Sequence, residues 1–154
     1  MKEKKLVLKL IEKGYKIATA ESCTGGMLAA HIVNVPMASK VLDESVVTYA
    51  NEAKIKYCGV APETIKKLGV VSEEVAAQMA KGIAKSAGAN VGVGISGIAG
   101  PSGGTTTKPV GMVCFGFCIN GKVQTHTKYF KGSRTSVRKK STKFAINKLL
   151  EILD

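Results

Sequence analysis

Three small polar residues and two glycines follow a short apolar run near the N-terminus, in the stretch IATAESCTGGMLAA over 17–30. A strand that turns sharply into a helix brings its turn residues to the unpaired N–H groups at the positive helix end. Such a place suits an activated nucleophile, an oxyanion or a phosphate. We therefore expect Ser22 to do chemistry, with Cys23 as the rival nucleophile, since a helix N-terminus also stabilises a thiolate. The plainer interpretations are a helix-capping serine and a buried thiol.

A serine hydroxyl needs a base to take its proton. His31 lies in a predicted helix and His126 in a predicted strand, and the sequence identifies no carboxylate beside either. Lys54 is the better candidate. With Asn51 as the N-cap it falls at the third helical position, where the positive helix end lowers its pKa. Tyr49 is placed to relay the proton or hold the substrate; the alternative for Lys54 is an ordinary solvated lysine.

The glycine-rich stretch 97–105, GIAGPSGGT, is too long for a simple connection and indicates a binding loop. It has neither dinucleotide-binding nor Walker spacing, yet its glycines let backbone N–H groups approach a phosphate. Arg134 and Arg138 lie four residues apart at the start of the last predicted helix and can hold a phosphate with paired N–H groups. The alternative is an ordinary basic helix face, which accounts for Lys139, Lys140 and Lys143.

The elements that must position these residues alternate between helix and strand. We expect an α/β fold: a single domain over 1–154, built as a three-layer α/β/α sandwich with a mixed, mostly parallel sheet and one antiparallel hairpin at Asn120-Gly121. Parallel strands end at one sheet edge, which brings Ser22, Tyr49 and Ser96 toward one cleft. Helices are predicted over 2–13, 24–33, about 36–42, 51–57 and 62–69, from Ser72, and from Ser133 or Thr135; strands over 15–20, 45–49, 90–96, 110–119 and 122–130.

Charge is unevenly distributed along the chain, whose formal net charge is +12. No acid occurs between Glu74 and Glu151, whereas twelve Lys or Arg residues do. This asymmetry favours an anionic partner such as a phosphorylated metabolite or a nucleic acid, although a solvated basic face explains it equally well. Aromatic residues make up 5% of the chain and are not interleaved with the basic ones, so a single-strand nucleic-acid binder is not expected.

The four cysteines and the hydropathy pattern exclude several classes. Cys23, Cys58, Cys114 and Cys118 form no CxxC motif and have no histidine at zinc-binding spacing, so no metal is expected. No apolar run approaches the roughly 20 residues of a membrane span, and the N-terminus lacks an apolar signal core. We expect a cytoplasmic protein with reduced thiols and no membrane partner.

Five motifs together resemble the C-terminal domain of the CinA family, over about residues 6–150: TAESCTGG at 19–26, YANEAK at 49–54, VSEEVA at 71–76, GIAGP at 97–101 and KPVG at 108–111. The resemblance implies a three-layer mixed-sheet fold and a homodimer. Its stand-alone members are nicotinamide-nucleotide amidases, which convert nicotinamide mononucleotide to nicotinate mononucleotide and ammonia without a cofactor. The alternative is a non-catalytic CinA-like protein that binds a nucleotide or a nucleic acid, of which the nucleic acid is the less expected partner.

Carried over by position, the resemblance implies Ser22 as the nucleophile, Tyr49 and Lys54 as its activators, and Ser39 in the site lining. Substrate contacts are expected from Cys23, Thr24, Gly25, Ser96, Gly97, Gly100 and either Arg134 or Arg138.

The chain departs from the family pattern at Met37, Glu44, Ser96 and Ser133. The bulk of Met37 and the charge of Glu44 are expected to alter a pocket wall, which leaves substrate identity less defined than the fold.

Overall fold

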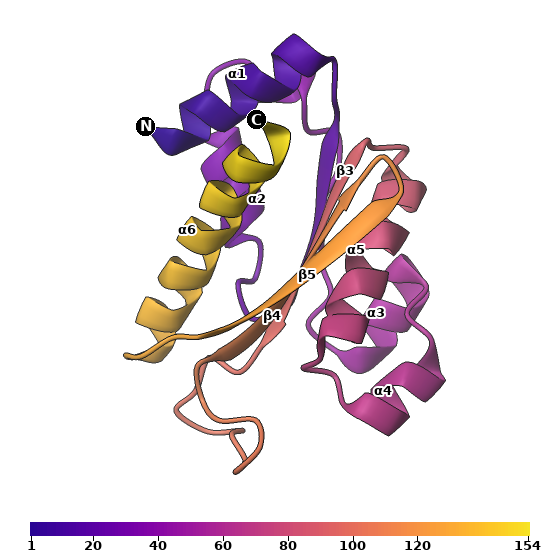
Figure 1. The fold of residues 1–154 in the computed structure, drawn as a ribbon, viewed down its shortest axis with the longest axis vertical. Helices are drawn as coiled ribbons and strands as arrows, with labels where there is room; N and C mark the ends of the chain where they lie inside the picture. The colour runs from indigo at the N-terminus through magenta and orange to yellow at the C-terminus, as the bar shows by residue number, and fades with distance from the viewer.

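A five-stranded mixed sheet in the order β2-β1-β3-β4-β5 forms the middle of the computed structural model, which describes all residues 1–154 (Figure 1). β1 pairs in parallel with β2 and β3, whereas β4 pairs antiparallel with β3 and β5. All strands except β4 therefore run in the same direction, as predicted. The strands are β1 Ile17–Glu21, β2 Val46–Val47, β3 Val91–Gly97, β4 Met112–Ile119 and β5 Lys122–Tyr129.

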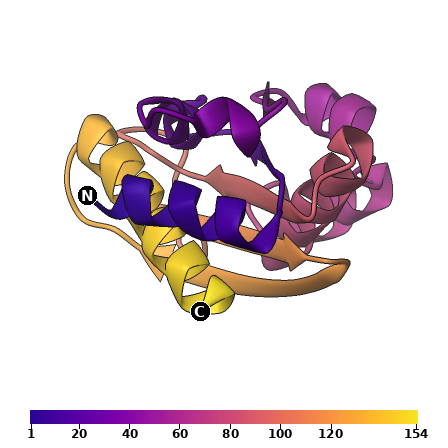
Figure 2. The same cartoon turned by 90° about the horizontal axis from the view of Figure 1, so that it is seen from above.

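Helices cover both faces of this sheet, which confirms the three-layer prediction (Figures 1 and 2). One layer contains α3 (Asn51–Cys58), α4 (Pro62–Leu68) and α5 (Glu73–Ala87). The other contains α1 (Lys2–Lys13), α2 (Met27–Val33) and α6 (Arg134–Leu153), and a short 3-10 helix, η1, covers Ala38–Lys40. No helix has both the length and the hydropathy that crossing a membrane requires.

The two faces are packed differently. Large aliphatic and aromatic side chains fill the space between the sheet and α1, α2 and α6. On the other face α5 lies against glycines of the sheet: a Cβ at Gly92, Gly94 or Gly116 would collide with the backbone of α5. This close approach fixes α5, and with it the segment that precedes its Ser72 cap, against the end of β3.

One edge of the sheet collects the predicted functional segments. Glu21, the last residue of β1, pairs with Val47 of β2 and with Ile95 of β3, so the three carboxyl ends coincide. The loop between β3 and β4 starts at this edge and returns to it. Since β5 runs parallel to β3, α6 also begins here. The expected convergence of strand ends is confirmed.

Several predicted boundaries were wrong, and the turn after β1 is the most important. α2 begins at Met27 rather than at Thr24, because Gly25 and Gly26 have φ of 58° and 95°, outside the helical region. Asn51 is not an N-cap; Ala50 is, and Asn51 is the first helical residue. The hairpin at Asn120-Gly121 is confirmed, with positive φ at both residues.

Candidate active site

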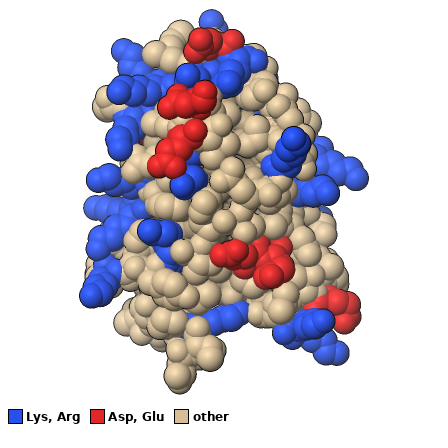
Figure 3. Space-filling view, in the orientation of Figure 1, with Lys and Arg blue, Asp and Glu red and all other residues tan.

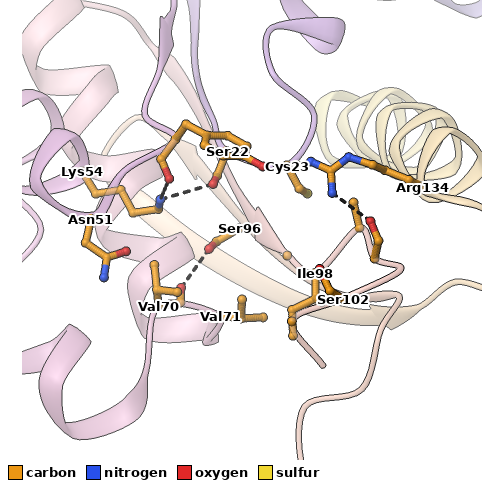
Figure 4. Close-up of a pocket in the computed structure, with 15 residues that line it drawn as sticks. Ser22, Cys23, Asn51, Lys54, Val70, Val71, Ser96, Ile98, Ser102 and Arg134 are labelled. Carbon is orange, nitrogen blue, oxygen red and sulfur yellow. Dashed lines mark hydrogen bonds between the residues drawn. The ribbon is translucent and has the colours of Figure 1, made fainter. Parts of the chain in front are cut away.

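A cavity of about 310 Å³ opens at the carboxyl edge of the sheet, and we name it the Ser22 cavity (Figure 4). It lies between the turn after β1, the start of α3, the segment before α5, the loop after β3 and the start of α6. Its lining includes most of the predicted site residues. The complete lining consists of Ser22, Cys23, Tyr49, Asn51, Lys54, Val70, Val71, Ser96–Gly100, Ser102, Gly103 and Arg134.

Lys54 is the most unusual side chain of the cavity, because a lysine is almost never fully buried. It is 1% exposed. Its Nζ lies 3.2 Å from Ser22 Oγ and donates to the carbonyl oxygens of Thr48 at 2.8 Å and Tyr49 at 3.2 Å. No carboxylate lies within ion-pair distance of it. Burial without an acidic partner favours the neutral amine.

Burial lowers the pKa of Lys54 and is the largest influence on it, ahead of the nearby thiols of Cys58 and Cys23, which raise it. The cause therefore differs from the positive helix end that the sequence suggested. A neutral amine has two N–H donors and one lone pair. The two carbonyls of residues 48 and 49 accept the donors, which leaves the lone pair for the hydroxyl proton of Ser22. This arrangement suits a general base.

The turn that carries Ser22 is held by Glu21, a residue whose role was not predicted from the sequence. Its fully buried carboxylate accepts hydrogen bonds from the backbone N–H groups of Leu28 and Ala29, at 2.9 and 3.0 Å. The positive end of α2 is thus already occupied by an internal anion. The signal available in the sequence was an acid directly after the apolar end of the predicted strand 15–20.

Backbone N–H groups suited to an oxyanion remain in the same turn. Those of Cys23 and Thr24 make no hydrogen bond within the chain. The N–H of Gly25, which was expected to contribute, is instead bonded to the carbonyl of Ser22 at 3.0 Å. Two adjacent free donors next to a nucleophile are the kind of group that can stabilise a tetrahedral oxyanion.

Cys23 is a poor rival for Ser22. Its thiol is 5% exposed, and burial raises its pKa to about 11. A thiol is nucleophilic only as the thiolate. At neutral pH the thiol of Cys23 is protonated, so the geometry favours Ser22 of the two.

The opposite end of the cavity is open and positively charged. Arg134 donates to the carbonyl of Gly100 at 2.8 Å and to the hydroxyl of Tyr49 at 2.9 Å, which ties α6 to the loop and to the rim of the cavity (Figure 4). The loop residues beside it keep their backbone N–H groups free of hydrogen bonds within the chain. These residues are Ala99, Gly100, Ser102 and Gly103. Free amides beside a guanidinium suit an anionic group.

Arg138 does not line the cavity, whereas Arg134 does. The sequence had left open which of these two arginines contacts the substrate. It donates from behind the turn, to the carbonyl of Cys23 at 2.9 Å and to that of Thr24 at 3.1 Å. Thr24 is fully buried, and its hydroxyl has no hydrogen-bond partner. The side chains of Arg138 and Thr24 support the turn rather than face the cavity.

Ser96 and the segment before α5 form the wall that faces Lys54. The hydroxyl of Ser96 donates to the carbonyl of Val70 at 2.8 Å. This bond holds Val70 and Val71 at the cavity, where with Ile98 they make an apolar surface (Figure 4). These apolar residues were not predicted from the sequence, because their place depends on the path of the chain between α4 and α5.

Ser39 is not where the resemblance implied. It is exposed in η1, and the bridge between Leu42 and Ile17 places this region at the amino end of β1, opposite the Ser22 cavity. Met37 and Glu44 are also absent from the cavity lining. The expectation that they reshape its wall is therefore wrong for this chain. Ser133, another of the departures, caps α6 by accepting from the N–H of Ser136.

The cavity holds no set of metal ligands: no group of three or more His, Cys, Asp or Glu side chains comes together anywhere in the chain. The polar groups that converge on it are a hydroxyl, an amine, a guanidinium and backbone amides. Such a set suits nucleophilic and proton-transfer chemistry on a substrate with an anionic group.

Solved structures share this fold over nearly the whole chain. A competence or damage-inducible protein from Enterobacter asburiae has a TM-score of 0.96 at 37% identity, covering 99% of this chain and 96% of the other. A CinA superfamily protein from Klebsiella pneumoniae has a TM-score of 0.95 at 36% identity, covering 99% and 95%.

Sequence relatives extend the same result. A competence-damage inducible protein of Clostridium acetobutylicum is 57% identical over 129 residues, 84% of this chain. A CinA-like protein of Kosmotoga olearia is 50% identical over 143 residues, 92% of this chain. The chain covers 31% and 35% of these relatives, about a third of their length. The family model of the CinA C-terminal domain matches residues 1–153. The chain belongs to the CinA family and corresponds to its C-terminal domain.

Proposed function

We propose that this protein is an amidohydrolase that converts nicotinamide mononucleotide and water to nicotinate mononucleotide and ammonia. The observation that carries the proposal is the contact between the buried Nζ of Lys54 and Ser22 Oγ, at 3.2 Å. A base-competent amine beside a serine hydroxyl is the requirement for covalent acyl transfer. The choice of substrate is supported by the resemblance to nicotinamide-nucleotide amidases and by the positive end of the cavity.

In the proposed reaction Ser22 Oγ attacks the carboxamide carbon while Lys54 takes the hydroxyl proton. The N–H groups of Cys23 and Thr24 stabilise the resulting oxyanion. Collapse of this tetrahedral intermediate breaks the C–N bond, and Lys54 returns the proton to the leaving ammonia. Water then attacks the acyl-enzyme with Lys54 as the base, which releases the carboxylate and restores Ser22.

The other end of the cavity is proposed to bind the phosphate. Arg134 supplies a charge, and the free N–H groups of the loop at Ala99, Gly100, Ser102 and Gly103 supply hydrogen bonds. The apolar surface of Val70, Val71 and Ile98 offers a contact for the planar pyridine ring. The cavity volume, about 310 Å³, is within the range of small-molecule sites.

The test is ammonia release from nicotinamide mononucleotide by the purified protein, with the deamidated nucleotide identified by mass. We expect turnover by the wild type and a loss of at least about 10³-fold in the variant Ser22→Ala. Nicotinamide riboside, which lacks the phosphate, should be a much poorer substrate. Binding of the nucleotide without ammonia release would instead support a non-catalytic nucleotide-binding protein. Full activity in Ser22→Ala would contradict the mechanism.

A further inference from the structure

A second cavity, of about 460 Å³, lies where α1, α2 and α6 meet, and we name it the three-helix cavity. It shares no lining residue with the Ser22 cavity. Each helix contributes residues: Lys2 and Glu3 come from the start of α1, Met27 and His31 from α2, and residues 139, 143, 146 and 147 from α6. The spacing of four between Met27 and His31, and between 139 and 143, places each pair on one helix face.

The charge of the three-helix cavity is predominantly positive. Lys139 and Lys143 form no ion pair and no hydrogen bond with any other residue, and Lys2 donates only to the neutral side chain of Asn147, at 2.7 Å. Glu3 is the one acid in the lining. Three ammonium groups and one carboxylate leave a net charge of +2, before any charge on His31.

The groups that face Glu3 keep its carboxylate charged. The carboxylate of Glu3 lies 3.1 Å from His31 Nδ1, and its own backbone N–H and His31 lower its pKa. Its carboxylate is therefore ionised at neutral pH and already has a partner. Glu3 therefore does not pair with Lys139 or Lys143, and these two lysines are free to bind an anionic ligand.

The floor of the three-helix cavity is apolar, in contrast to its rim. Ile146 is buried and Met27 is half-buried, and the methylene stems of the lysines extend the same surface. Figure 3 shows that Lys and Arg side chains gather along the side of the molecule where α6 and the start of α1 lie. A concave apolar floor with a cationic rim selects a ligand with an apolar body and an anionic group.

We propose that the three-helix cavity binds a phosphate monoester with an apolar body, such as an aryl or alkyl phosphate. The phosphate, with a charge near −2, matches the net +2 of the rim and lies between Lys139 and Lys143. The apolar body packs on Met27 and Ile146. This site is independent of the proposed amidase chemistry, since none of its residues belongs to the Ser22 cavity.

The test follows the methyl resonance of Met27 in protein with ¹³C-labelled methionine methyl groups. Phenyl phosphate serves as the probe, and the resonance is assigned with the variant Met27→Leu. We expect a saturable shift of Met27, whereas the exposed Met37 stays in place. Inorganic phosphate and phenol, each carrying half of the proposed chemistry, should bind at least about tenfold more weakly than phenyl phosphate.

Charge variants separate a specific site from general attraction to a basic protein. The double variant Lys139→Ala, Lys143→Ala should raise the dissociation constant for phenyl phosphate by about tenfold or more. The matched control Lys131→Ala, Lys140→Ala removes the same charge outside the cavity and should leave it within about twofold. The titration is repeated in Ser22→Ala, in which the shift should persist even if the amidase proposal fails.

Three results would overturn the proposal. The first is a Met27 resonance that does not move, and the second is an equal loss of affinity in the two double variants. The third is a cavity closed by a second copy of the chain. Sedimentation would then show an oligomer that phenyl phosphate does not alter and that the Lys139→Ala, Lys143→Ala variant dissociates.

Discussion

At one end of the Ser22 cavity Lys54 is 1% exposed and its amine contacts three oxygens, whereas at the other end Arg134 is exposed beside a loop with free backbone amides. The first end is closed by the chain's own carbonyls. The second end leaves its donors open to an incoming group. Both ends lie at the same sheet edge, yet they differ in burial, in charge and in how many of their polar groups already have partners.

This difference suits the two ends to different tasks, proton transfer at the Lys54 end and ligand binding at the Arg134 end. A buried amine that contacts three oxygens is held in one position, and its burial shifts its pKa toward the neutral form that proton transfer requires. An exposed guanidinium that is already tied to Gly100 and Tyr49, with unpaired backbone amides beside it, presents donors that a ligand can accept when it arrives. We therefore expect changes at the Lys54 end to act on kcat and changes at the Arg134 end to act on KM.

The largest effect is expected from Lys54→Met, which keeps much of the volume of the side chain and removes the base. Its kcat for ammonia release should fall by about 10³- to 10⁴-fold. The matched control is Lys56→Met, an exposed lysine on the same helix, which should retain wild-type turnover. Circular dichroism and thermal unfolding check that both variants fold. A folded Lys54→Met with normal kcat would remove the base from the proposed mechanism.

The next largest effect is expected in the pH dependence of kcat/KM of the wild-type protein. The base must be neutral in the free enzyme, so kcat/KM should rise by about tenfold per pH unit up to the pKa of Lys54 and then level off. Because burial lowers that pKa, the plateau should begin below the ordinary value of 10.5. A profile that falls with rising pH from neutrality would contradict a lysine base.

The pH dependence of the free energy of unfolding tests the pKa of Lys54 independently of activity. The folded pKa of Lys54 is below its unfolded pKa, so the unfolded state binds the proton more tightly. The free energy of unfolding should therefore gain from Lys54 as pH rises from the lowered pKa toward 10.5. Urea unfolding across this window should show the gain in the wild type and its loss in Lys54→Met.

A smaller effect is expected at the open end. Arg134→Ala should raise KM for nicotinamide mononucleotide by about 10- to 100-fold, because it removes a charged hydrogen-bond donor from the proposed phosphate site. Its kcat should change little. The exposed Lys131, which lies outside the cavity lining, provides the control Lys131→Ala. If the effect of Arg134→Ala fell on kcat alone, the division between the two ends would be wrong.

The smallest effect is expected from Cys23→Ala. The thiol lines the cavity, but its pKa of about 11 keeps it protonated at neutral pH. Steady-state turnover should stay within about threefold of the wild type, and iodoacetamide should not inactivate the enzyme at neutral pH. Loss of turnover in a folded Cys23→Ala variant would show that the Cys23 thiol, rather than Ser22, is the nucleophile.

Much of the fold was predictable because its signals are local. Alternating apolar positions, the Ser72 cap and the Asn120-Gly121 turn act over a few residues, and all of them are confirmed. Boundaries at turns were less predictable: the start of α2 depends on two backbone angles at Gly25 and Gly26 rather than on hydropathy. Ser39 was misplaced because a motif transfers residue identity but not position relative to the cavity.

The sequence by itself determined the alternation of helices and strands, the order of the motifs, and the polar residues that follow β1, β2 and β3. These depend on propensity and periodicity, which each short segment carries within itself. Only the tertiary structure decided that Lys54 is buried, that Arg134 rather than Arg138 lines the cavity, and that Glu21 occupies the positive end of α2. Burial, distance and shared hydrogen bonds are properties of segments far apart in the chain, so they exist only once the sheet brings those segments together.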